Sequence, residues 1–379
     1  MLAVGLMSGT SLDGTDAALV EITGVNEQTK VQLRHFNSYP FTAAVKERIQ
    51  AALTPETSDV AAICSLDFEL GALFGAAVQQ VCREAGVPLS ALSFIASHGQ
   101  TIYHLPRPEN NAQVPSTMQI GEPAVIAEQT RIPVISNFRE ADLAAGGQGA
   151  PIVPYSEYVL YRSATATRIL QNIGGIGNAT IIPRQGHLND LLAFDTGPGN
   201  MVIDELCRHF YQEEYDHDGR HGAAGQVDET VLRQLLTHPY FQRPLPKTTG
   251  REDFGQAYAA RLLKKYADLA PDDLIATATA LTARSIAGAI EPYCQKPTEL
   301  IVAGGGSYNR TLMAMLQEAL PQVAVSTQED HGYSSAAKEA IAMVVLGNQT
   351  WQGQPSNVPS ATGANRSVIL GRITPVDAS

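Results

Sequence analysis

The strongest constraint on the fold of this chain is a long polar turn between two short apolar runs at its beginning. The runs are LAVGLM (2–7) and AALVEI (17–22), and the turn reads SGTSLDGTD. Two apolar runs joined in this way predict a β-hairpin, although hairpin turns usually need only about two to five residues. The next run, VQLRHFNSY (31–39), alternates apolar and polar residues and predicts a third strand beside the hairpin.

A second stretch repeats this arrangement near the middle of the chain. RILQNIGGIGNATIIP (168–183) again encloses a Gly/Asn turn between two apolar runs, although the residues themselves differ. We interpret this as a weak internal repeat, in which each half of the chain opens with a hairpin whose turn faces a phosphate.

Other patterns predict the remaining helices and strands. Leu66, Leu70, Phe74 and Val81 recur at helical spacing, and Asp253 with Gln256 has the spacing of a helix-capping box. The tail from 351 to 379 is rich in Pro, Ser, Gly and Asn and predicts little regular structure. We expect helices over 66–85, 253–267, 272–291 and 310–320, strands over 94–100 and 133–138, and further strands that begin at 191 and 298.

The length and apolar content of the chain favour two globular domains. Its 379 residues are 44% hydrophobic, which is too much chain for one core and enough apolar material for two. We place the crossing in 142–167, which contains the glycine-rich loop DLAAGGQGAP. The N-terminal lobe would then comprise 1–141, joined by 335–379, and the C-terminal lobe 168–334.

The charge and the cysteines restrict partners and compartment. The chain has 38 acidic and 26 basic residues and a net charge of -12, which repels nucleic acid and anionic membranes, so we expect neither as a partner. Residues 1–7 lack the basic region of a signal peptide, and we expect no other apolar run to span a membrane. Four widely spaced cysteines suit reduced thiols, so we expect a cytoplasmic protein.

The first turn is the strongest chemical signal. Over Gly5 to Asp16 the small residues let the backbone approach a phosphate, while Ser8, Thr10 and Ser11 offer hydroxyls. Asp13 and Asp16 can hold hydrated magnesium. The turn lacks the lysine of a Walker loop. The alternative is an ordinary polar hairpin turn, but the length of this turn favours phosphate binding.

Three further patterns in the second half are weaker on their own. NIGGIGN (172–178) is equally well explained as a tight turn. AGGGSYN (303–309) follows a strand and opens a helix, so it suits an anion and a purine, and Ser307 or Asn309 can cap the same helix. Asp195 ends a buried strand at the turn TGPGN and suits a general base, but capping the turn or the helix that follows is equally consistent.

Other polar groups have simpler explanations than metal binding. The spacing of His98 and His104 fits neither a helical HExxH pair nor a zinc finger, so we expect a sugar-hydroxyl contact or a satisfied strand-end histidine. DHDGRHG (216–222) lacks the ligand periodicity of a calcium loop and is interpreted as a mobile loop. Glu339 alone would be a solvated helix residue. Arg139 can bind a carboxylate in bidentate fashion or form a structural ion pair.

Together these segments resemble the anhydro-N-acetylmuramic acid kinase family nearly end to end. GLMSGTSLDGTD, SHGQTIYH, QIGEPAVIAE, NFREADLAAGGQGAP, NIGGIGN, FDTGPGN, GGGSYN and ATGA occur in the family's order. The resemblance implies an α/β, two-domain actin-like fold (ribonuclease H-like, as in sugar kinases and heat-shock ATPases), with ATP and Mg²⁺ in the interdomain cleft. The implied reaction opens the ring of 1,6-anhydro-N-acetylmuramic acid with water and phosphorylates the freed 6-oxygen. The resemblance does not decide whether the protein forms a homodimer.

The patterns and the resemblance together give the expected sites. Asp195 would activate water, and Asp13 and Asp16 would hold the metal. The sugar-binding residues would be His98, Gln100, Arg139 and Glu339. The nucleotide-binding residues would be Gly9, Thr10, Ser11, Leu12, Asp13, Gly14, Thr15, Asp16, Asn172, Gly174, Gly175, Gly304, Gly305 and Gly306.

Two rival functions share this fold. Another sugar or acid kinase would keep the phosphate-binding turns and change only the sugar-facing residues. A nucleotide-gated scaffold or chaperone, like actin or the heat-shock ATPases, would hydrolyse ATP slowly without any sugar.

Overall fold

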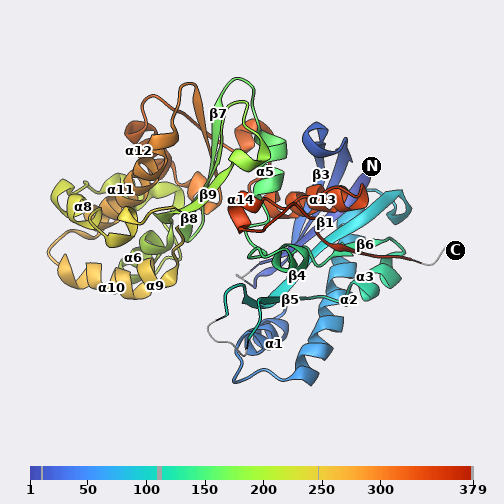
Figure 1. The fold of residues 1–379 in the computed structure, drawn as a ribbon. Coiled ribbons are helices and arrows are strands. Elements are labelled where there is room, and N and C mark those ends of the chain that lie inside the picture. Colours follow the sequence, from blue (N-terminus) through green and yellow to red (C-terminus); the bar gives the residue numbers. More distant parts are fainter. Residues whose placement is uncertain (10–11, 109–112, 246, 377–379) are drawn as a thin grey trace. The chain divides into compact units, whose positions relative to one another are not determined.

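The computed structural model describes residues 1–9, 12–108, 113–245 and 247–376 (Figure 1). The chain forms two compact units: unit 1 comprises Met1–Leu160 with Ala336–Ser379, and unit 2 comprises Tyr161–Ser335. Most of the segment that we expected to be the crossing, residues 142–160, belongs to unit 1 and contributes parts of helices α4 (Glu140–Ala144) and α5 (Pro154–Tyr161) to it.

The sheet of unit 1 is built on the predicted hairpin. β1 (Leu2–Ser8), β2 (Gly14–Thr23) and β3 (Lys30–Pro40) are antiparallel neighbours in that order. On the other side of β1 the sheet continues through β4, β6 and β12, and β5 pairs with β4. The bounds of these strands are β4 (Leu92–Leu105), β5 (Ser116–Ile120), β6 (Val134–Ser136) and β12 (Arg372–Thr374).

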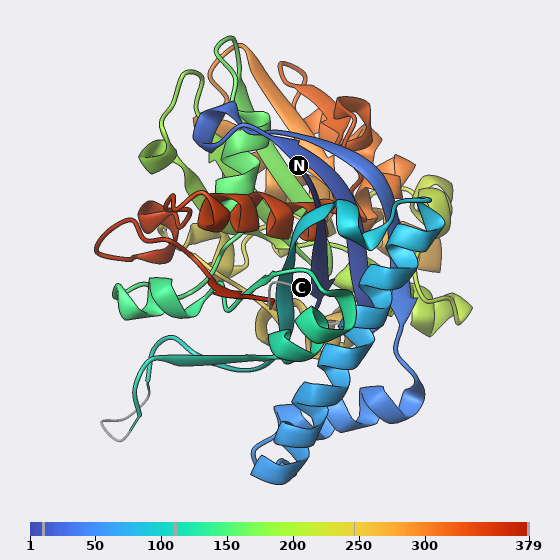
Figure 2. The same ribbon diagram turned by 90° about the vertical axis from the view of Figure 1, so that its right-hand side faces the viewer.

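Alternate residues of β1 face two different helices. Val4 and Leu6 are buried in one apolar core with Leu66 and Phe74 of α2 (Val60–Glu84). Gly5 points to the opposite face, because side chains alternate along a strand. There it meets α13 (Lys338–Trp351), and a Cβ at Gly5 would lie only 1.9 Å from the carbonyl oxygen of Ala340. The sheet of unit 1 is therefore covered on both faces, by the light-blue α2 and the red α13 in Figure 2.

Helix α2 begins earlier than the apolar spacing predicted. Asp59 caps it at Val60 by accepting hydrogen bonds from the amides of Ala61 and Ala62, both at 2.9 Å. Among the described residues α2 is also the one helix that is long and apolar enough to cross a membrane, which we did not expect. A core helix passes the same test, and α2 buries one face in the core of unit 1. Helices α1 (Ala43–Leu53) and α3 (Pro123–Thr130) pack against α2 in this unit.

Unit 2 repeats the strand order of unit 1. Its sheet has the order β11-β10-β7-β8-β9, so in both units the first strand lies between the second strand of its hairpin and a parallel strand from later in the chain. The expected α/β class, the internal repeat and the actin-like architecture are confirmed by this duplication. The strands are β7 (Thr167–Ile173), β8 (Ile176–Ile182), β9 (Leu192–Pro198), β10 (Thr298–Ala303) and β11 (Ala324–Thr327).

A buried helix, α11 (Pro271–Ile290), organises the core of unit 2. Its N-terminal half, Leu274 to Leu281, belongs to an apolar cluster with α6 and α10, and its C-terminal half, Ala283 to Ile290, belongs to a second cluster with the sheet and α12. The remaining bounds in this unit are α6 (Met201–Tyr211), α7 (Arg220–Ala224), α8 (Glu229–Leu235), α9 (Arg251–Phe254), α10 (Gln256–Lys265) and α12 (Arg310–Ala319).

The helix predicted over 253–267 is interrupted. Gly255 is extended (φ -83°, ψ -160°) and separates α9 from α10. The predicted capping box is wrong, because the Asp253 carboxylate accepts hydrogen bonds from Thr249 Oγ1 at 2.8 Å and Arg243 Nη1 at 3.2 Å, while α10 has no side-chain cap.

The C-terminal tail is fixed to unit 1 by a buried carboxylate. Asp142 Oδ1 accepts hydrogen bonds from Asn357 Nδ2 and Thr362 Oγ1, both at 2.8 Å, and Asp142 Oδ2 accepts one from the amide of Gly149 at 2.8 Å. Between residues 353 and 376 the structure describes two short elements, α14 (Pro359–Thr362) and β12, in keeping with the little regular structure that the composition predicted.

We predict that Asp142→Ala lowers the free energy of unfolding by about 3 kcal/mol, because three buried donors lose their acceptor together. Chemical denaturation measures the loss, and limited proteolysis should cut the tail after residue 355 more rapidly. Asp268→Ala, at an exposed aspartate, is the matched control. Equal stability of the two variants would contradict the assigned role.

Candidate active site

The turn between β1 and β2 depends on glycine. A Cβ at Gly14 would lie 2.2 Å from the carbonyl oxygen of Tyr39 in the neighbouring strand. Leu12 has φ 59° and is buried, so it holds this end of the turn in place. Gly9 has open space where a Cβ would be, and Thr10 and Ser11 lie outside the described residues. The buried Thr15 Oγ1 has no hydrogen-bond partner within the described part of unit 1.

Three carboxylates influence one another beside this turn. Desolvation raises the pKa of Asp16, Ser38 lowers it by hydrogen bonding, and the charge of Asp13 raises it. Desolvation also raises the pKa of Glu339, although its side chain is exposed; Lys338 opposes that rise and Asp16 adds to it. Asp13 is exposed, and its Oδ1 lies 3.8 Å from Nζ of Lys46. A divalent cation would relieve this repulsion, so the donor set fits magnesium, although the described residues contain no cluster of three or more metal-ligating side chains.

His98 and Arg139 form one buried polar pair. His98 Nδ1 donates to the carbonyl oxygen of Gly99 at 2.8 Å, so Nε2 is the acceptor for Arg139 Nε at 3.1 Å and Nη2 at 2.9 Å. Burial and the guanidinium charge lower the pKa of His98 to about 3. This histidine is therefore neutral at physiological pH and orients the arginine, whose Nη1 also donates to the carbonyl oxygen of Gly149 at 2.7 Å.

Gln100 supports the end of β1. Its Oε1 accepts a hydrogen bond from Ser8 Oγ at 2.6 Å, and its Nε2 donates to the carbonyl oxygen of Thr101 at 3.1 Å. The side chain of Gln100 is buried, and both the oxygen and the nitrogen of its amide form hydrogen bonds within unit 1. Of the four expected sugar-binding residues, His98 and Glu339 both interact electrostatically with Arg139, whereas Gln100 has a structural partner.

A polar cavity of about 150 Å³ lies beside His98. We call it the unit 1 cavity. Its walls come from β4, from the segment between the end of β5 and the start of α3, and from one residue of α2. Ser136, the last residue of β6, and Asn137, which follows it, complete the lining. The lining residues are Asp67, Ser97, His98, Gly99, Gln119, Ile120, Gly121, Glu122, Pro123, Ser136 and Asn137.

In unit 2, three glycine-rich turns meet at one end of the sheet. The amides of Gly199 and Asn200 donate to the carbonyl oxygens of Gly175 at 2.9 Å and Gly174 at 2.7 Å. Gly304 has φ 83°, and a Cβ there would lie 2.8 Å from the carbonyl oxygen of Ile173. At Gly199 and Gly304 the backbones lie too close for a side chain, since a Cβ at Gly199 would lie 2.2 Å from the carbonyl oxygen of Gly174. The turns after β7, β9 and β10 bring together the expected Asn172, Gly174, Gly175, Gly304, Gly305 and Gly306.

Asp195 lies on β9, four residues before this junction. Its Oδ2 accepts a hydrogen bond from the amide of Thr249 at 2.9 Å, and its backbone carbonyl accepts one from the hydroxyl of Tyr240 at 2.6 Å. Desolvation raises the pKa of Asp195, the Thr249 amide lowers it and Glu252 raises it. The carboxylate caps neither the TGPGN turn nor α6, since its recorded acceptor bond is to Thr249. It is a partly buried carboxylate held by one backbone amide, an arrangement that a general base can use.

A second cavity, of about 470 Å³, opens beside the glycine junction. This unit 2 cavity lies between α6, the segment 214–218 and the start of α12. Asp204 of α6 faces it, and burial together with neighbouring acids raises the pKa of Asp204 to about 7, against the opposing charge of Arg208. The lining residues are Asn200, Ile203, Asp204, Glu214, Tyr215, Asp216, His217, Asp218, Gly305, Tyr308 and Asn309.

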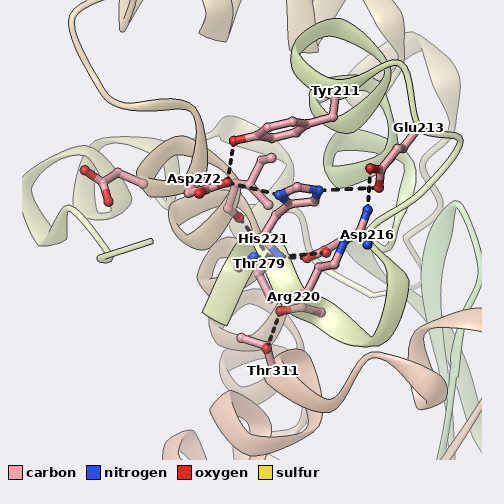
Figure 3. Close-up of polar contacts among 12 residues, drawn as sticks. Tyr211, Glu213, Asp216, Arg220, His221, Asp272, Thr279 and Thr311 are labelled. Carbon is pink, nitrogen blue, oxygen red and sulfur yellow. Dashed lines mark hydrogen bonds and ion pairs between the residues drawn. The ribbon is translucent and has the colours of Figure 1, made fainter. Parts of the chain in front are cut away.

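The segment DHDGRHG is held in place by hydrogen bonds, which differs from the mobile loop that we expected (Figure 3). Asp216 accepts hydrogen bonds from the amides of His221 at 2.9 Å and Gly222 at 3.0 Å. The His221 ring lies between Asp272 and Glu213, and Thr311 Oγ1 donates to the carbonyl oxygen of Gly219 at 2.6 Å. The first three residues of this segment, Asp216, His217 and Asp218, line the unit 2 cavity. The signal of this segment in the sequence was the spacing of small and acidic residues, which we interpreted only as a failed calcium loop.

Cap residues at the start of α12 are also resolved. Asn309 Oδ1 accepts a hydrogen bond from the amide of Leu312 at 2.9 Å, so Asn309 is the cap, while Ser307 Oγ donates to the carbonyl oxygen of Gly304 at 2.8 Å. Sequence reasoning missed Asp67, Ser97, Asp142 and Asp204. Ser97 and Asp142 lie inside motifs that we quoted, so the signal was present but ambiguous.

The family model for anhydro-N-acetylmuramic acid kinase matches residues 1–376. The chain is 52% identical to the anhydro-N-acetylmuramic acid kinase of Bacillus cereus (strain G9842) and 51% identical to that of Bacillus anthracis, over 99% of both chains in each case.

Similar solved structures include an activator of 2-hydroxyisocaproyl-CoA dehydratase from Clostridium difficile (TM-score 0.45, 9% identity, covering 91% of this chain and 93% of that one). Another is a ROK family glucokinase from Streptomyces griseus (TM-score 0.40, 10% identity, covering 91% and 99%). The full-length match to the family model and the identity to its curated members lead to one conclusion: the chain belongs to the anhydro-N-acetylmuramic acid kinase family.

Proposed function

We propose that the protein is an ATP-dependent kinase that hydrolyses the 1,6-anhydro bond of anhydro-N-acetylmuramic acid and phosphorylates O6, in the recycling of peptidoglycan. Family membership over residues 1–376 supports the kinase activity and the substrate. The observation that carries the hydrolytic step is Asp195, a partly buried carboxylate fixed by the Thr249 amide beside three glycine turns.

In this mechanism Asp195 accepts a proton from water as the water oxygen bonds to the anomeric carbon. The bond from that carbon to O6 breaks, and O6 takes the γ-phosphoryl group of ATP. The products are N-acetylmuramic acid 6-phosphate, ADP and one proton. Because burial raises the pKa of Asp195, its basic form is lost at a higher pH than that of an ordinary aspartate as the solution is acidified.

The nucleotide would be held by glycine backbone and by the unit 2 cavity. The turn Gly9–Asp16 and the turns at 174–175 and 304–306 would receive the phosphates, and the cavity beside Gly305 would receive the nucleoside. Asp13 and Asp16 would hold Mg²⁺. When bound, that ion would neutralise charge on the phosphates.

The sugar would be bound mainly by Arg139 and Glu339. The guanidinium suits the lactyl carboxylate, and neutral His98 keeps its planar fork oriented. Glu339 would accept hydrogen bonds from the sugar. Gln100 would act through Ser8, by fixing the end of β1.

A cytoplasmic location, where ATP is available, and a homodimer are further predictions. The rival sugar kinase and the ATP-gated scaffold are separated from our proposal by ADP release across a panel of sugars, since a scaffold would release ADP equally without any sugar.

We predict that turnover in ¹⁸O-labelled water places one heavy oxygen on the anomeric hydroxyl of the product and none on the phosphate. Water attacks carbon in this mechanism, and the phosphoryl group is transferred to O6 without hydrolysis. Mass spectrometry of the intact product and of its released phosphate locates the label. An unlabelled sugar product would contradict the proposal that hydrolysis of the anhydro bond is coupled to phosphorylation.

Asp195→Asn should lower kcat by about 10²- to 10⁴-fold, the usual contribution of a general base, while KM for ATP changes little. Steady-state kinetics of ADP release measures both constants. Asp190→Asn, at an exposed aspartate of the same unit, is the control and should behave as wild type. A variant at position 195 with normal turnover would remove Asp195 from the mechanism.

Gly305→Leu should raise KM for ATP about tenfold or more and leave KM for the sugar unchanged, because the new side chain would fill part of the unit 2 cavity. Gly288→Leu is the matched control, since a Cβ at Gly288 meets open space. An unchanged KM for ATP would show that the nucleoside binds elsewhere.

A further inference from the structure

We propose that Glu157 of α5 and Lys338 of α13 form a buried ion pair that aims the neighbouring Glu339 at the sugar. Both are positioning residues, since they act through Glu339 rather than through contact with the substrate. The inference rests on the proposed function for the role of Glu339. It assigns a role to two charged residues that the mechanism does not otherwise use.

The ion pair joins two helices of unit 1. Nζ of Lys338, the first residue of α13, lies 2.5 Å from Oε1 of Glu157. The side chains are only 13% exposed for Lys338 and 6% exposed for Glu157. Lys338 is also the only cation within ion-pair distance of Glu157 among the described residues. Turning Lys338 away would therefore leave a buried carboxylate without a counter-charge, which is costly.

Helix α5 is a fixed support for this pair. Tyr158, next to Glu157, is buried, and its hydroxyl donates to Oε1 of Glu27 at 2.6 Å, in the turn between β2 and β3. The chain leaves unit 1 at the end of α5 and re-enters it at Ala336, two residues before Lys338. The ion pair thus ties together two segments that are separated in the sequence by the whole of unit 2.

The first turn of α13 needs such an anchor. Every residue from Ala340 to Thr350 is buried, whereas Glu339 is exposed. Asn348 Nδ2 donates to the carbonyl oxygen of Gly24 at 3.1 Å, but Asn348 lies ten residues from Lys338, which is about 15 Å along a helix. Because helix ends fray, a polar contact at Lys338 holds the part of α13 that the core does not.

Fixing Lys338 also fixes the direction of Glu339. Successive side chains of an α-helix lie about 100° apart around its axis, so a lysine held against α5 turns the next residue to a different face. There Glu339 lies within electrostatic range of Asp16 and Arg139. Desolvation raises the pKa of Glu339, and the charge of Lys338 is the largest effect that opposes this rise. The same cation therefore aims the carboxylate and favours its ionised form.

A contribution to stability alone does not account for the pair. Removing two charges from water costs about as much as their attraction returns, so an apolar pair of similar volume is often at least as stable. What an ion pair adds to such a contact is a defined geometry between the two groups. This distinction makes the positioning role testable apart from folding.

The first test measures sugar binding without turnover, by calorimetric titration of the full-length protein with anhydro-N-acetylmuramic acid. Glu157→Gln should weaken the Kd for the sugar about tenfold, because Glu339 is no longer aimed, while the Kd for ATP stays constant. Glu69→Gln is the matched control, since it removes an exposed ion pair with Arg48 between α1 and α2 of the same unit and should bind both ligands as wild type does. An unchanged Kd for the sugar in Glu157→Gln would overturn the proposal.

A double-mutant cycle separates positioning from a general disturbance of unit 1. In a Glu339→Ala background, Glu157→Gln should have no further effect on the Kd for the sugar, because no carboxylate is left to aim. An equal loss in both backgrounds would show that the ion pair does not act through Glu339. That result would also overturn the proposal.

Hydrogen exchange provides a readout that needs no ligand. The amide of Ile341 donates to the carbonyl oxygen of Ala337 at 2.9 Å and closes the first turn of α13. It should exchange several-fold faster in Glu157→Gln than in wild type or Glu69→Gln, and equal exchange would contradict the anchoring role. Faster exchange, together with a wild type that forms no ADP from this sugar, would refute the proposed function and still support the ion pair as the anchor of Glu339.

A second variant keeps the test decisive if Glu157→Gln does not fold. Glu157→Leu combined with Lys338→Met leaves no buried charge without a partner, so its thermal melt should stay close to that of wild type. The same weakening of sugar binding is expected in this double variant. Wild-type affinity for the sugar in a folded double variant would overturn the proposal.

Discussion

The contact between Gly5 of β1 and the backbone of α13 at Ala340 is the constraint on which unit 1 depends. No side chain fits at Gly5, so the helix lies directly against the strand. This contact fixes the first turn of α13, and with it Glu339, within electrostatic range of Asp16 and Arg139. It also joins the two ends of the chain into one unit, since β1 and α13 are separated by more than the whole of unit 2.

The repeated strand order explains why polar residues gather where they do. In each unit a hairpin and later parallel strands end at one edge of the sheet, and ligands of open α/β sheets bind outside such strand ends. In unit 2 that edge carries the glycine junction, Asp195 and the larger cavity. In unit 1 the His98–Arg139 pair and the smaller cavity follow the end of β4 and β6.

Patterns in the sequence predicted the hairpins, their repeat and the strand-end position of Asp195, because apolar periodicity and turn composition act locally. They could not predict contacts between distant segments. Asp142 looks like any acidic helix residue until Asn357 and Thr362 are known to reach it. Ser97 is one hydroxyl in a buried strand, and only the missing partner distinguishes it. The helix predicted over 253–267 is broken because Gly255 adopts an extended conformation, which the capping pattern did not reveal.

The discontinuity of unit 1 has a consequence for biosynthesis. Unit 2 is a contiguous segment, Tyr161–Ser335, whereas unit 1 needs α13 and the tail to cover β1. Domains fold as units while the ribosome delivers them from the N-terminus. The inserted unit can therefore complete its core on the nascent chain, while the Gly5 face of the first sheet stays uncovered until α13 has been synthesised.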